Sequence, residues 1–141
     1  MISDMNISYV EGKIEPASLA KQKFPKLNIN LDSVNSTGTG VEIKYTFVAD
    51  YFESEDKESK NIGQIKLGGI VNITDSKDNI ATLLKRWNEK KTLPPQIAEE
   101  VLNALSFRCS ASGTLLAYVL GLIPPLITST IKIQDTNTKE K

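Results

Sequence analysis

The first half of the chain contains four segments in which apolar and polar residues alternate, the pattern of β-strands with one buried face. These segments are residues 5–14, 27–32, 41–52 and 62–74. The third is the clearest, because Val41, Ile43 and Phe47 fall on one side and Glu42 and Lys44 on the other. Loops as short as those between the later segments usually join antiparallel neighbours. We therefore predict an antiparallel sheet of about four strands with one apolar face.

In the second half the apolar residues recur every three to four positions, as in helices with one buried side. The spacing of Ile80, Leu84 and Trp87 predicts a first helix, and Gly121 is a suitable end for a second, longer one. The predicted helices are residues 78–89 and 96–120. Because strands come first and helices last, we predict an α+β fold with the long and the short helix packed on one face of the sheet.

The length of the chain suits one domain. We predict a single α+β domain over residues 1–134 and a polar, flexible tail over residues 135–141.

The charges of the chain cancel, with 17 basic and 17 acidic residues. No overall field therefore attracts nucleic acid or an anionic membrane. The most apolar run, residues 115–127, is too short to cross a bilayer and contains Pro124 and Pro125. No signal-peptide pattern is apparent at the N-terminus. We expect a cytoplasmic protein that neither binds nucleic acid nor inserts into a membrane.

The densest basic patch surrounds a tryptophan. It consists of Lys85, Arg86, Lys90 and Lys91, with Trp87 among them. One interpretation is that Trp87 stacks on a base. The other, which we favour, is a core tryptophan with lysines at its edge.

The residues needed for common catalytic chemistry are missing. The chain has no histidine, the commonest general base and metal ligand near neutral pH. Its one cysteine, Cys109, lies in an apolar helical stripe, where a packed thiol is the simpler interpretation than a nucleophile. Phosphate-binding and hydrolase motifs are also absent from the sequence. We predict a protein that is not an enzyme and uses no cofactor or metal.

Apolar residues beyond simple packing needs occur near residue 52 and around residues 118–127. A core segment alone explains them, and a surface for extended polypeptide is the competing interpretation. The candidate polypeptide-binding residues are Tyr51, Phe52, Tyr118, Leu122, Ile123, Leu126 and Ile127.

Small residues gather in the middle of the long predicted helix and would let another backbone approach closely. This contact is either internal, against the sheet, or between subunits. The candidate subunit-interface residues are Cys109, Ser110, Ser112, Gly113 and Leu116.

The order of these segments resembles the SecB-like export chaperones over residues 6–133. The segments that carry the resemblance are KLNINLD (26–32), VEIKYTFVADYF (41–52), QIKLGGIVNI (64–73) and GLIPPLI (121–127). Gly121, Pro124 and Leu126 match a Gly-x-x-Pro-x-Leu element that follows the long helix in that family. The resemblance implies a dimer of dimers with the long helix at subunit interfaces, and apolar grooves for non-native polypeptide. The tail QDTNTKEK lacks the cysteine and histidine of the family's metal-binding tail, which puts docking on the export motor in doubt.

We therefore expect an ATP-independent holdase chaperone that binds non-native polypeptides, in protein export or another system. It would assemble as a homodimer or homotetramer. Two alternatives stay open: an adaptor or structural subunit dedicated to one protein partner, and a protein that binds a small apolar ligand.

Overall fold

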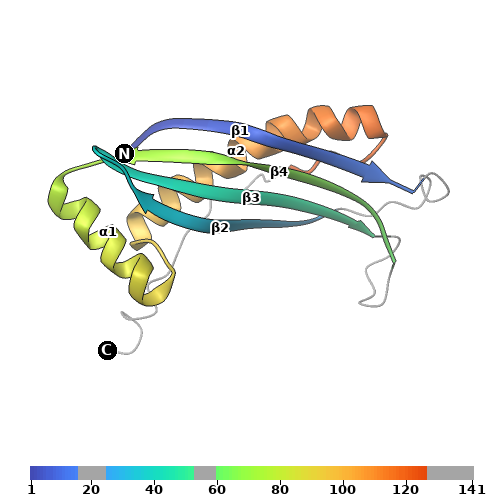
Figure 1. Ribbon diagram of the computed structural model, residues 1–141. Helices are drawn as coiled ribbons and strands as arrows, with labels where there is room; N and C mark the ends of the chain where they lie inside the picture. The colour runs from blue at the N-terminus through green and yellow to red at the C-terminus, as the bar shows by residue number, and fades with distance from the viewer. Residues whose placement is uncertain (16–24, 53–59, 127–141) are drawn as a thin grey trace.

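The computed structural model describes residues 1–15, 25–52 and 60–126, and these form one antiparallel sheet with helices on one face (Figure 1). The elements are β1 (Ile2–Ile14), β2 (Lys26–Ser36), β3 (Gly40–Phe52), β4 (Asn61–Thr74), α1 (Lys77–Lys90) and α2 (Pro95–Leu120). The sheet has four strands in the order β1-β4-β3-β2, so β1 and β2 lie at its edges. The predicted α+β class, with a four-stranded antiparallel sheet, is confirmed.

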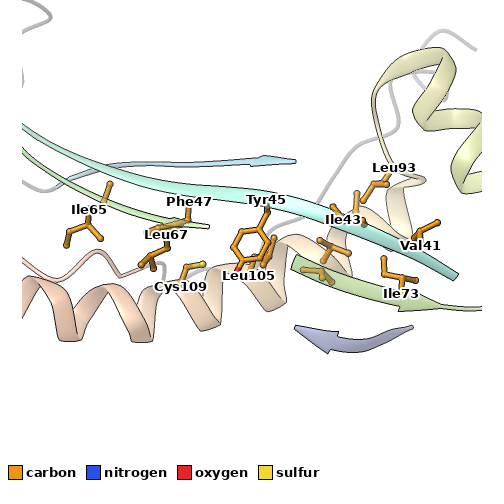
Figure 2. Packing of buried hydrophobic residues seen from close by; sticks show 14 of the residues in the cluster. Val41, Ile43, Tyr45, Phe47, Ile65, Leu67, Ile73, Leu93, Leu105 and Cys109 are labelled. Carbon is orange, nitrogen blue, oxygen red and sulfur yellow. The ribbon is translucent and has the colours of Figure 1, made fainter. Parts of the chain in front are cut away.

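The core lies on the helix side of β3 and β4. Alternate β3 residues from Val41 to Tyr51 are buried, and most of them pair with an apolar β4 residue on the same face, such as Phe47 with Leu67. Figure 2 shows these side chains directed toward α2, where Leu105 and Cys109 lie against them. The alternation seen in the sequence therefore marks the buried face.

β2 continues further than its sequence pattern predicted. The second predicted strand ended at residue 32, but Val34 pairs with Ile43 and Ser36 with Val41. A register shift between Leu31 and Ser33 interrupts the alternation, so the sequence pattern ends at residue 32 although the strand continues.

The two helices end at residues that suit their caps. The Ser76 side chain accepts a hydrogen bond from the Asn79 N–H at the start of α1. Gly121, with φ 73°, ends α2 in the left-handed conformation, as the sequence predicted. Pro95 occupies the first turn of α2, where its missing N–H costs little.

The helices divide the sheet between them. α1 contacts β2 and β3, whereas α2 packs mainly against β1 and β4. At one end of this packing the Ile2 N–H donates to Glu100 Oε1 at 3.1 Å, and at the other Gly12 faces Leu120. This division leaves the helix-side face of β2 only partly covered.

Candidate functional site

The outward side of α2 carries large apolar residues that no described residue covers. Phe107, Leu115, Tyr118 and Val119 are 81%, 73%, 88% and 79% exposed. Their spacing places them on one side of the helix. We call these four residues the α2 stripe. Exposed apolar residues gathered in this way are typical of an interaction surface.

On its helix side, the β1 edge of the sheet adds the exposed apolar residue Val10. Val10 pairs with Leu67 and therefore faces the helix side of the sheet, yet it remains exposed. Two residues further along the same strand, a Cβ on Gly12 would lie 2.7 Å from Leu120 Cδ1. The C-terminal end of α2 and the β1 edge are therefore close neighbours.

A second apolar surface lies between β2, α1 and the start of α2. It is a groove with a volume of about 540 Å³, which we call the β2 groove. Its apolar lining is Ile29, Leu31, Trp87, Leu93, Ala98 and Leu102, and its polar lining is Asn30, Arg86, Lys90, Lys91 and Thr92. The groove is open because the helix-facing residues of β2 are half-buried, whereas those of the neighbouring β3 are buried.

The predicted polypeptide-binding residues divide between core and surface. Tyr51 and Leu122 are buried, and the Tyr51 hydroxyl donates a 2.5 Å hydrogen bond to the carbonyl oxygen of Ile123. This burial raises the pKa of Tyr51 to about 12. Tyr118 and Leu126 are exposed.

Phe52 and Ile127 are the remaining two of the seven predicted polypeptide-binding residues. Phe52 is half-buried, with the Lys26 ammonium 5.0 Å from its ring centre. Ile127 lies outside the described residues. The structure therefore does not gather the seven predicted residues into one exposed surface. Tyr51 and Ile123 instead tie the segment after α2 to β3.

The predicted subunit-interface residues mostly face the sheet. Cys109, Ser110 and Gly113 are buried, and a Cβ on Gly113 would lie 2.7 Å from the Pro125 ring. Ser112 and Leu116 are half-buried. Within one chain the small residues thus make a close internal contact, and their role between subunits stays a prediction.

The sequence interpretation missed most of the α2 stripe. Of the four residues, only Tyr118 was among the candidate polypeptide-binding residues. Phe107 and Leu115 are eight positions apart, and Leu115 and Val119 are four apart. Such separations place side chains near one another on a helix, so they were a usable signal for a second apolar side of α2. Ile29 and Leu31 of the β2 groove were expected only as part of the predicted strand 27–32.

The buried Cys109 thiol is not activated as a nucleophile by its surroundings. Burial raises the pKa of the Cys109 thiol to about 11, so the thiol stays protonated near neutral pH. Among the residues placed in the structure, no cluster of three acidic, cysteine or histidine residues is suited to hold a metal ion. None of the described helices is long and apolar enough to cross a bilayer.

Comparison with known proteins supports the fold and goes no further. Neither a protein-family model nor a curated protein matches the sequence. Among solved structures, the fold is similar to the Mycobacterium tuberculosis SecB-like chaperone Rv1957, solved in complex with a ChAD peptide from the HigA1 antitoxin. The TM-score is 0.60 and the identity 10%, over 95% of this chain and 92% of that one. The chain therefore has a SecB-like fold.

Proposed function

We propose that the protein is an ATP-independent holdase chaperone that binds non-native polypeptide segments through exposed apolar surface. The observation that carries this proposal is the α2 stripe, Phe107, Leu115, Tyr118 and Val119. The SecB-like fold supports it, because a chaperone of that fold binds a peptide from another protein.

Such binding needs no chemical step. Each apolar contact contributes about 25 cal/mol per Å² of area removed from water. A long unfolded client can make several such contacts at once, and linked weak contacts add to a useful affinity. The interaction requires apolar side chains in the client and no fixed sequence.

The proposed binding surface combines two of the residues expected from sequence with three found in the structure. Tyr118 and Leu126 are exposed and available for contact, as are Phe107, Leu115 and Val119. In this proposal the buried Tyr51 and Leu122 support the binding surface from inside the chain, and the hydrogen bond from Tyr51 to Ile123 holds the segment after α2 in place.

Part of the α2 stripe is also the surface on which we propose that the chain self-associates, as a dimer or tetramer. A helix that is apolar on both sides is typical of a buried position. A second copy covering one end of the stripe would leave the other end for the client. The mass in solution, measured over a range of concentrations, tests this assembly.

A dedicated adaptor is the second candidate. The structural neighbour was solved with a peptide from a single antitoxin, which favours recognition of one partner. An adaptor would bind that partner and leave unrelated aggregating proteins unprotected. The same aggregation assay therefore separates the two functions.

The test is suppression of light scattering from a thermally aggregating client by the full chain at stoichiometric amounts. We expect suppression by the natural chain and a clear loss in the double variant Leu115→Ser/Tyr118→Ser. Gln96→Ser is the matched control, because Gln96 is an exposed polar side chain on the same helix about three turns before the stripe begins. Equal suppression by all three proteins would remove the α2 stripe from the mechanism, and no suppression by any would refute the holdase.

A further inference from the structure

The β2 groove joins an apolar floor to a cationic rim, and we propose that it selects extended polypeptide segments in which apolar residues are flanked by acidic ones. This inference rests on the proposed chaperone function and adds a chemical preference to it. It concerns a surface separate from the α2 stripe.

The floor of the groove suits apolar side chains. Trp87 and Leu93 are almost fully buried beneath it, and Ile29 and Leu31 of β2 border it with half-buried side chains. A volume of about 540 Å³ lies in the range of sites that bind compact ligands or a few side chains. An apolar segment seated here would cover the face of β2 that the helices leave open.

The rim carries positive charge on one side. Arg86, Lys90 and Lys91 line the groove, and none of its described lining residues is acidic. The Arg86 Nε–H donates to Thr92 Oγ1 at 3.3 Å, which holds that side chain near the turn between α1 and α2. Lys91 Nζ lies 5.8 Å from the centre of the Trp87 ring. Carboxylates beside the apolar residues of a bound segment would complement these cations.

The neighbouring backbone favours an extended ligand. β2 pairs with β3 on one side, and no described strand pairs with its other edge. The three consecutive residues Ile29, Asn30 and Leu31 bring this edge strand to the groove. Unpaired strand edges accept extended segments by main-chain hydrogen bonds.

Nucleic acid fits the groove less well than polypeptide. Proteins that bind single strands stack bases on exposed aromatic rings among their basic residues. Trp87 is only 7% exposed, and the remaining floor is aliphatic. The basic patch noted in the sequence therefore lacks the stacking platform that a base would need.

The experiment measures binding of labelled peptides to the full chain by fluorescence anisotropy. Two peptides share the same apolar centre and differ only in Asp/Glu or Lys flanks. We expect the acidic peptide to bind at least five-fold more tightly at low salt, with the difference shrinking as salt screens the exposed charges. In Lys90→Gln/Lys91→Asn the preference should fall to two-fold or less; asparagine suits position 91 because Lys91 has a φ of 55°.

The matched control is Lys77→Gln/Lys85→Gln, which removes the same charge from α1 outside the lining of the groove. It should keep the preference. Equal binding of both peptides by a chain that still suppresses aggregation would overturn this inference and leave the chaperone function standing. Loss of both activities would overturn the two together.

Two other occupants are also distinguished by the test. Displacement of the acidic peptide by oligo-dT, with oligo-dT binding lost in Lys90→Gln/Lys91→Asn, would make the groove a nucleic-acid site. A fall in solution mass as the acidic peptide saturates would instead show that the groove holds a second copy of the chain. Either result overturns the polypeptide proposal.

Discussion

The two sides of α2 consist of similar residues in opposite surroundings. On the inner side Leu105, Cys109 and Ala117 are completely buried, whereas Leu115 and Tyr118 on the outer side are largely exposed. Apolar residues on both sides of a helix are typical of a helix that is covered on both sides. The sheet therefore covers one side of α2, and no described residue covers the other.

The sheet repeats this contrast between its centre and its edge. Phe47 in β3 is fully buried, but its β2 partner Ile29 is only half-buried. Central strands are covered by the helices, while edge strands offer both side chains and backbone to other molecules. The α2 stripe and the β2 groove are therefore places where the packing of one chain is incomplete.

The largest expected effect is the difference in stability between alanine substitutions on the buried and on the exposed side of α2. Leu105→Ala should lower the free energy of unfolding by about 2–5 kcal/mol, because it leaves a cavity in the core. Leu115→Ala should change it by no more than about 0.5 kcal/mol at concentrations low enough to keep the chain dissociated. Urea unfolding at low protein concentration measures both. Similar losses in the two variants would contradict the assignment of an inner and an outer side.

The fold was predictable where only one side of an element is apolar. In β3 the alternation is unambiguous, because Glu42 and Lys44 separate the buried residues, and the predicted strand matches the observed one to within a residue. In α2 both sides are apolar, so the period reveals a helix and leaves its orientation undetermined. This is why the sequence did not reveal most of the α2 stripe.

The prediction of the binding residues was less accurate for two reasons. The orientation of α2 was undetermined, and tertiary contacts that the sequence does not show decide which apolar residues are buried. Tyr51 and Leu122 are as apolar as surface binding residues would be, but contacts far apart in sequence decide their burial. The 2.5 Å hydrogen bond from the Tyr51 hydroxyl to Ile123 spans 72 positions. The β2 groove depends on three separate elements, which no local pattern shows to be neighbours.

A pH titration sharpens the comparison through Cys109 on the inner side. Burial raises the pKa of its thiol from 9.0 to about 11, partly offset by the hydrogen bond with Tyr45. Because the folded pKa is the higher one, the stabilisation is complete below pH 9 and is lost as the pH rises toward 11. At about 1.4 kcal/mol per pKa unit, the loss is of the order of 2 kcal/mol.

The measurement is the free energy of unfolding between pH 8 and 11, for the natural chain and Cys109→Ala. The alanine variant should start less stable, because of its small cavity, and lose less stability over that range. The raised pKa of Tyr51 acts in the same direction in both proteins above pH 10 and cancels in their difference. Cys109 also raises the pKa of Tyr45, so the difference reports the thiol together with its interaction with Tyr45. Parallel curves would show that the thiol is not buried in the folded chain.

A smaller effect is expected at the close contact between α2 and the segment that follows it. Gly113→Ala would place a Cβ 2.7 Å from Pro125 Cγ, and a proline ring cannot move aside easily. Overpacking costs about 1–3 kcal/mol, and alanine recovers about 1 kcal/mol of helix propensity. We expect a net loss of about 1 kcal/mol in the free energy of unfolding.

The double variant Gly113→Ala/Pro125→Ala tests the cause of that loss. Removal of the ring relieves the contact, so the two substitutions should be non-additive by more than about 0.5 kcal/mol. Additive losses would mean that the small residues of α2 do not pack against this segment. The alternative prediction, that they lie in a subunit interface, would then be favoured.

The smallest effect runs in the opposite direction and concerns a polar group on the inner side of α2. Ser106 is buried, and its hydroxyl has no hydrogen-bond partner among the described residues. An unsatisfied buried hydroxyl destabilises the folded state, and alanine is also the better helix former by about 0.5 kcal/mol. We expect Ser106→Ala to raise the free energy of unfolding by about 0.5–1 kcal/mol, more than Ser112→Ala at a half-buried position of the same helix. A loss of stability in Ser106→Ala would show that the hydroxyl is bonded in the folded protein, and that this part of α2 is covered by more than the described chain.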